Sequence, residues 1–358
     1  GMKYIGYAAF SSCDKLAAIS LPDGVTYIGR SAFSSCSGLT GFRVPEGVIV
    51  IENSTFSHCT NLKSITVSST VTQIGESAFY DCIELSAVTI PEGLTTIGAK
   101  AFSACLKLES IVLPNSLTTI ESEAFYNCTK LTSIAIPKQI KEIPKMLCQF
   151  CSELESVEIP NGVTSIGEQA FYSCKKLKSI VVPETVEAIG AGAFYSCQQL
   201  VSAVLPKQLK VISDALFYEC QMLKLVTGPD IITSINSFAF GECQSLERFE
   251  VSEGLKEIGS NAFFNCKNME YFIVPSTVSV IGDSAFNGCE KLETVEIQGG
   301  ITSIADETFK GCSGLTSVTI PEGVTSIGNS AFMGCKGLSW IPIPKSVVSV
   351  GAKAFSGC

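Results

Sequence analysis

A cysteine recurs every 23 residues from one end of the chain to the other. A phenylalanine precedes each of them by three residues, as in Phe10, Phe33 and Phe194, except that Cys148 stands in the phenylalanine position of its repeat. A pattern kept at one fixed period means that the same supersecondary unit is stacked on itself many times. The recurring cysteines are Cys13, Cys36, Cys59, Cys82, Cys105, Cys128, Cys151, Cys174, Cys197, Cys220, Cys243, Cys266, Cys289, Cys312, Cys335 and Cys358.

The unbroken period decides the expected domain organisation. A length of 358 residues would ordinarily suggest two or three domains. Because the repeat runs through without a slip, we expect residues 1–358 to form a single domain of about 15.5 repeats, with no separate cap domain. Apolar residues make up 46% of the chain and charged residues 16%, enough for a continuous core.

The composition excludes some partners. The formal net charge of −9 argues against nucleic acid, since binding phosphates needs clustered Lys and Arg. No run of 18 apolar residues occurs, so no transmembrane segment is expected. No signal peptide or anchor is visible, and Gly1 before Met2 is typical of a cleaved tag. We therefore expect the natural protein to contain sequence before the repeats.

One repeat, residues 315–335, illustrates the expected local structure. Val318 and Ile320 alternate with polar residues, the period of a half-buried strand. A Pro-Glu-Gly turn then leads to a second extended segment that ends in an isoleucine, the position of Ile189 in its own repeat. Ala331, Phe332 and Cys335 follow at helical spacing, which predicts one or two turns of α- or 3₁₀-helix.

Stacked repeats of this kind predict a solenoid. The strand, the second extended segment and the short helical turn each have too small an apolar face to bury alone, so neighbouring repeats complete the core. We expect a right-handed, curved superhelix with a parallel β-sheet of about fifteen strands on its concave side. The phenylalanine, isoleucine and cysteine columns are the expected structural ladder.

The pattern LxxLxL, a turn and the closing IGxxAFxxC resembles the BspA-like class of leucine-rich repeats, over essentially residues 5–358. Proteins of that class are typically secreted or attached to the surface of bacteria and some protists. They are implicated in adhesion to host proteins, matrix or other cells. The resemblance implies a secreted or cell-surface location and an adhesive role, and it leaves the ligand open.

Seventeen cysteines require a choice between core thiols, disulfides and metal ligands. In-register Cβ vectors run parallel, which disfavours disulfides between repeats, so buried free thiols are the favoured interpretation. Cys148 and Cys151 form a CxxC pair, but no second pair completes a zinc site. His58 is the only histidine, and we interpret it as a surface residue. We expect no cofactor, no metal and no enzymatic activity.

The outward positions of the strands suggest a binding surface. The third strand position is mostly Ser or Ala through Ser202, and then becomes Leu225, Arg248 and Tyr271 in successive repeats. Tyr and Arg are enriched at interface hot spots, which favours a site for a protein or glycan; neutral drift of a solvent face is the alternative. The other residues of this predicted patch are Ile273, Glu247, Glu250 and Glu270.

Three functions compete at this stage. The favoured hypothesis is a non-enzymatic, extracellular binding module whose concave face takes a protein or glycan ligand. The alternative is a structural spacer that displays another domain of a longer surface protein. An enzyme is disfavoured because the strict spacing leaves no insertion that could form a lid. The lack of polar capping repeats suggests end-to-end self-association or continuation into further domains.

Overall fold

The computed structural model describes all residues from 1 to 358. It contains 27 short strands and no helix, so no segment is a helix long enough to cross a membrane. The chain divides into two compact units, Gly1–Leu177 and Lys178–Cys358, each a stack of 23-residue repeats. A single domain over residues 1–358 stays a prediction.

Each repeat passes through three parts, called below the strand segment, the second segment and the turn segment. In unit 1 the strand segments are β3 (Gly41–Arg43), β5 (Ser64–Thr66), β7 (Ala87–Thr89), β10 (Ser133–Ala135) and β12 (Ser156–Glu158). Its second segments are β1 (Tyr4–Ile5), β2 (Tyr27–Ile28), β4 (Val50–Ile51), β6 (Gln73–Ile74), β8 (Thr96–Ile97), β9 (Thr119–Ile120), β11 (Glu142–Ile143) and β13 (Ser165–Ile166).

Unit 2 follows the same order. Its strand segments are β14 (Ser179–Val181), β16 (Ser202–Val204), β18 (Leu225–Thr227), β21 (Tyr271–Val274), β23 (Thr294–Ile297) and β25 (Ser317–Thr319). Its second segments are β15 (Ala188–Ile189), β17 (Val211–Ile212), β19 (Ser234–Ile235), β20 (Glu257–Ile258), β22 (Val280–Ile281), β24 (Ser303–Ile304), β26 (Ser326–Ile327) and β27 (Ser349–Val350).

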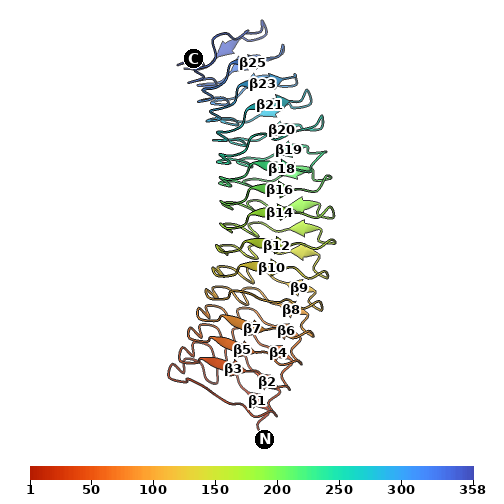
Figure 1. The fold of residues 1–358 in the computed structure, drawn as a ribbon, viewed down its shortest axis with the longest axis vertical. Helices are drawn as coiled ribbons and strands as arrows, with labels where there is room; N and C mark the ends of the chain where they lie inside the picture. Colours follow the sequence, from red (N-terminus) through yellow and green to blue (C-terminus); the bar gives the residue numbers. More distant parts are fainter. The chain divides into compact units, whose positions relative to one another are not determined.

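Neighbouring repeats pair in parallel with a shift of 23 residues, as in Ser202↔Leu225 and Ile74↔Ile97. Within each unit the strands therefore lie one above another (Figure 1). The alternating pattern explains the pairing, since Val226 and Val295 point inward between exposed neighbours. The sheet is less continuous than expected: residues 110–112 in unit 1 and 248–250 in unit 2 are not strands. Each break divides the sheet of strand segments in its unit into two separate sheets.

The predicted helical turn is wrong. The turn segment is a chain of β-turns in which two residues per repeat have positive φ, for example Ser31 (55°) and Ser35 (59°). These left-handed residues break any helix after two or three residues. Successive backbone N–H groups donate alternately to the next repeat and to their own turn. Phe33 N–H donates to Thr55 O in the next repeat, and Cys36 N–H donates to Phe33 O within the turn. The inward residues still match the expected spacing, because Ala32, Phe33 and Cys36 are fully buried.

The core consists of columns of identical residues. Phenylalanine rings stack along the turn segments, with centroids 5.6 Å apart for Phe33–Phe56 and 5.2 Å for Phe263–Phe286. Phe194 and Cys197 are fully buried and Ile189 is 3% exposed, whereas Phe10 and Cys13 in the first turn segment are only half-buried. Each neighbouring repeat therefore covers the next, as stacking requires.

The cysteines have a second role besides filling space. The Cys59 thiol donates to Phe33 O at 3.1 Å, and the same bond recurs along the column, for example from Cys289 to Phe263 O at 3.2 Å. All seventeen are free thiols; Cys358 is exposed and Cys13 half-buried, and the rest are buried. Burial raises the pKa of Cys59 and of Cys289 to about 12. These are core thiols that satisfy a backbone carbonyl.

Candidate binding surface

The residues of the predicted patch all lie in unit 2, on the outward face of the strand segments. Leu225 is 43% exposed on β18, and Tyr271 and Ile273 are 41% and 45% exposed on β21. Because Tyr271 and Ile273 are two residues apart on one strand, their side chains point to the same side. Arg248 and Glu250 lie on the strand segment between β18 and β21, and both are exposed.

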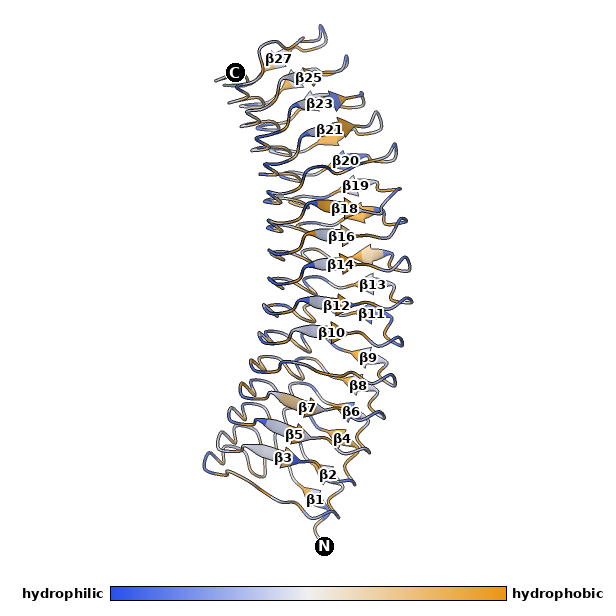
Figure 2. Cartoon of the chain, in the orientation of Figure 1, coloured by the Kyte–Doolittle hydropathy of each residue, from blue (hydrophilic) through white to orange (hydrophobic).

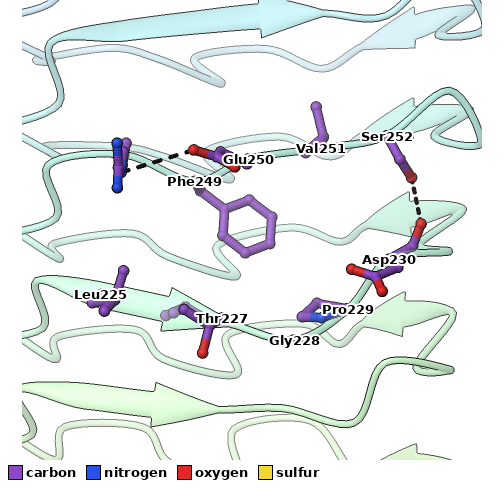
Figure 3. A pocket seen from close by; sticks show the side chains of 11 residues that line it. Leu225, Thr227, Gly228, Pro229, Asp230, Phe249, Glu250, Val251 and Ser252 are labelled. Atoms are coloured by element: carbon purple, nitrogen blue, oxygen red, sulfur yellow. Dashed lines mark hydrogen bonds and ion pairs between the residues drawn. The ribbon is translucent and has the colours of Figure 1, made fainter.

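The structure adds a feature that the sequence analysis did not include. A cavity of about 350 Å³ opens between β18 and the strand segment of Arg248. Leu225, Thr227 and Gly228 line one side, and Phe249 and Glu250 line the other (Figure 3). Arg248, next to Phe249 in the chain, also lines the cavity. Tyr271 and Ile273 are on the next strand and do not line it. The predicted patch thus consists of a slot and, beside it, the exposed Tyr271 and Ile273 of β21.

The slot exists because the backbone ladder is open at this point. At the same place in the neighbouring repeats, Lys224 N–H donates to Val201 O and Glu270 N–H donates to Glu247 O, at 2.9 and 3.2 Å. No backbone hydrogen bond joins residues 247–251 to β18. The two segments are held at their edge by the Ser252 hydroxyl, which donates to Asp230 O at 2.7 Å.

Gly228 lies at the edge of the opening. The corresponding residue is Val, Ile or Leu in the other repeats, so this one lacks an apolar side chain. A Cβ on Gly228 would lie 1.7 Å from Leu205 O, and its φ is +121°. The backbone therefore lies close against the preceding repeat, in a conformation that only glycine adopts readily. Phe249 does not explain the slot, since Phe42 and Phe272 occupy its position within regular strands.

The charges around the slot are mostly negative. Arg248 Nε lies 3.9 Å from Glu250 Oε1, and their side chains are 56% and 75% exposed. A pair so exposed and so long contributes little, so the guanidinium is available to a partner. Glu247 and Glu270 are also exposed, on successive repeats. Of these carboxylates, Glu250 is the one within ion-pair distance of Arg248.

The sequence analysis missed two valines on this face. Val181 and Val204 are 63% and 40% exposed, at the fifth strand position, and the register aligns both with Thr227. They extend the apolar surface from Leu225 across β16 and β14. In Figure 2, β18 and β21 are more hydrophobic in colour than β3 and β5 of unit 1. The sequence contained the information needed to find them, because the alternation within the strand already marks the fifth position as outward.

The other sequence candidates do not form a reactive site. His58 is exposed and its Nδ1 lies 3.0 Å from Asp81 Oδ2, which is a surface pair. Cys148 and Cys151 are fully buried. Burial is the main reason that the pKa of Cys148 lies well above its usual value, and a hydrogen bond with Cys151 raises it further. A protonated, buried thiol is a poor nucleophile and a poor metal ligand.

Comparison with known proteins places these features in a family. The model for the BspA type leucine rich repeat region matches residues 1–109, 95–224 and 233–358. None of the curated proteins matches the chain.

Two solved structures are similar to this chain over most of its length. A leucine-rich repeat protein from Bacteroides ovatus is 32% identical with a TM-score of 0.71, and the match covers 99% of this chain and 80% of that one. A leucine rich cell surface protein from Faecalibacterium prausnitzii is 30% identical with a TM-score of 0.55, with coverage of 89% and 85%. Both share the repeat solenoid.

Proposed function

The chain belongs to the BspA-type leucine-rich repeat family, and from this premise we propose that it is a non-enzymatic, cell-surface or secreted module that binds a protein or glycan. The family is typically one of binding modules without catalysis. The similar protein from Faecalibacterium prausnitzii is a cell surface protein, which supports the same location here. The proposed ligand surface is the outward face of β14 to β23, with the slot at Arg248 near its centre.

One observation carries the proposal: the slot, the exposed apolar residues and Arg248 coincide on one face. Leu225, Tyr271 and Ile273 offer rigid apolar area, and Arg248 offers a charged donor that its neighbours satisfy only weakly. The cavity of about 350 Å³ accepts a single side chain or sugar unit of a larger ligand. An area of this kind, open rather than enclosed, favours a macromolecular partner over a small molecule.

A structural spacer is the competing function. A spacer needs solubility and stiffness, and it has no use for a row of exposed apolar residues such as Val181, Val204 and Tyr271. It also has no use for a slot between two strand segments. Ligand capture by this chain alone would favour the binding module, whereas a spacer captures nothing.

The test is capture of host proteins and glycans on an array by wild type and by Arg248→Ala/Tyr271→Ala. We expect at least a tenfold loss of capture, since two hot-spot truncations each cost roughly 1–2 kcal/mol or more. The acidic surroundings predict a neutral or basic ligand and weaker capture at high salt. The matched control is Ser133→Ala/Ser156→Ala on β10 and β12, which should leave capture unchanged.

A folded double variant that captures as well as wild type would refute this surface as the ligand site. Capture of nothing by the wild type would refute the binding module and favour the spacer. Melting temperature and circular dichroism of each variant establish that the solenoid is intact.

A further inference from the structure

A second surface, on the turn segments of unit 2, carries an unusual group of aromatic residues. Tyr195, Tyr218 and Phe238, with the methyl group of Ala215, line a hollow of about 270 Å³. They come from three successive repeats and lie outside the sheet face discussed above. The Tyr195 and Tyr218 rings are 5.0 Å apart and tilted by 34°, and Phe238 meets Tyr218 edge-on at 5.6 Å and 76°. The rings therefore form inclined walls and not a flat platform.

The backbone is built to hold this arrangement. A Cβ at position 241 would lie 2.7 Å from Cδ2 of Tyr218, so the Tyr218 ring lies over the bare backbone of Gly241 in the next repeat. Glycine at this position lets the ring reach Phe238.

Phe238 has no evident role in stability. It has φ +57° and is 39% exposed, and no other repeat has an aromatic residue at that left-handed position. A bulky residue in this conformation costs about 1–3 kcal/mol, which the fold would avoid with Ser or Asn. Asn261 takes the same position in the following repeat. A strained, exposed phenylalanine indicates a surface function.

The charge around the hollow is negative. The turn segments of these repeats, residues 190–199, 213–222 and 236–245, contain Asp214, Glu219 and Glu242 and no Lys or Arg. Glu242 is held in place, since Asn265 Nδ2 donates to its Oε1 at 2.7 Å. Burial raises the pKa of the Tyr218 phenol, and the carboxylates of Glu242 and Glu219 raise it further. These two carboxylates therefore lie near the Tyr218 hydroxyl, at one edge of the hollow.

We propose that the hollow of Tyr195, Tyr218 and Phe238 binds a trimethylammonium group. Aromatic faces attract cations through their quadrupole, and several rings around a methylated ammonium are a favourable arrangement because that cation is weakly hydrated. The neighbouring carboxylates favour a positive charge over a neutral sugar or an anion. This site is independent of the sheet face, so either can fail without the other.

Unit 1 contains a similar cluster of aromatic rings, which can be compared with the hollow of unit 2. Tyr126, Phe150 and Tyr172 also meet edge-on, at 5.5 and 5.4 Å, and Phe150 has φ +64°. Their turn segments, residues 121–130, 144–153 and 167–176, carry four lysines against four glutamates, whereas the turn segments of the hollow carry three carboxylates and no Lys or Arg. The lysines are Lys130, Lys145, Lys175 and Lys176, and the glutamates are Glu121, Glu123, Glu153 and Glu168. The similar rings in a more positive setting should bind the cation poorly.

The experiment titrates the full chain with choline and, separately, with its neutral isostere 3,3-dimethylbutan-1-ol, observing the ligand methyl signals by NMR. We expect saturable choline binding with an upfield ring-current shift, and binding of the alcohol at least about tenfold weaker. Phe238→Asn and Tyr218→Leu should each weaken choline binding about tenfold, and Glu242→Gln about threefold. Phe238→Asn keeps a residue that tolerates the left-handed conformation, so it should fold at least as well as wild type.

Phe150→Asn is the matched control and should bind choline like wild type. Equal affinity for choline and the alcohol, no choline binding by folded protein, or an unaffected Phe238→Asn variant would each overturn the proposal. Preferential binding of methyl glucoside would overturn it in favour of a sugar. A parallel arm with phosphatidylcholine vesicles identifies the source: binding supports a lipid headgroup, and choline binding without vesicle binding supports a soluble trimethylammonium compound.

Discussion

At the scale of single residues, the cysteine shows how one side chain serves both the core and the backbone. Its small apolar volume fits between stacked phenylalanines, and its S–H donates a second hydrogen bond to a carbonyl that already accepts one from a β-turn N–H. Cys312 donates in this way to Phe286 O at 3.1 Å, and Cys289 N–H donates to the same oxygen at 3.2 Å. The sequence predicted burial of the column from its periodicity. It could not predict the hydrogen bond, which depends on where the turns point the carbonyl.

The buried thiols predict a loss of stability at alkaline pH. Burial raises the pKa of Cys289 from 9.0 to about 12. The unfolded chain therefore releases this proton first, so the stabilisation is complete below pH 9 and is lost as pH rises towards 12. At pH 10.5 one such thiol lowers the free energy of unfolding by about 2 kcal/mol. Urea denaturation of wild type and Cys289→Ala at pH 7.5 and 10.5 should show a smaller alkaline loss in the variant.

Cys358→Ala is the control: this thiol is exposed at the end of the chain, and although burial also raises its pKa, its removal should change the pH dependence less than Cys289→Ala does. An equal alkaline loss in wild type and Cys289→Ala would mean that the buried thiol does not drive the effect.

At the scale of the structural element, the strands were predictable and the turn segments were not. Alternation of apolar and polar residues identifies β23 or β25 directly, because inward and outward positions differ in polarity. The turn segment has Ala, Phe and Cys at helical spacing, yet residues such as Ser54, Lys100 and Glu123 take left-handed φ there. Nothing in those side chain types requires that conformation; the hydrogen bonds to the next repeat impose it.

The same distinction applies to the candidate site. Outward residues such as Arg248 and Tyr271 were found from the alternation, whereas the slot depends on an open backbone ladder. Gly228, at a position that is otherwise Val, Ile or Leu, lies at the edge of the slot, but the ladder is also open at residues 110–112, where no glycine is present.

The imposed left-handed residues predict that glycine can stabilise the turn segment. Met146 has φ +54°, so Met146→Gly removes the Cβ clash of this conformation. We expect the free energy of unfolding to rise by up to about 1 kcal/mol, measured by urea denaturation. Lys145→Gly, one residue earlier and without a positive φ, is the control and should destabilise the protein. If both variants lose stability alike, the conformational cost of the left-handed position is not significant here.

At the scale of the whole molecule, the strand pairs and the thiol hydrogen bonds join adjacent repeats. Strand pairs shift by 23 residues, and the thiol hydrogen bonds span 26. No strand pairing closes the chain between distant repeats. Stability in such a stack is close to a sum over repeats and their interfaces, so damage should stay local.

This locality predicts how a core mutation spreads. Phe240 is fully buried between Phe217 and Phe263, with ring centroids 5.7 and 5.3 Å away. Phe240→Ala should lower local stability by about 3–5 kcal/mol, as truncation of a buried phenylalanine does. Hydrogen exchange measured by mass spectrometry should then accelerate in the repeats of Phe217, Phe240 and Phe263, while residues 1–109 keep their protection. Phe238→Ala, two residues away but exposed, is the matched control and should leave exchange unchanged throughout. Because neighbouring repeats share their interfaces, a uniform acceleration over the entire chain would instead mean that the stack unfolds as one cooperative unit.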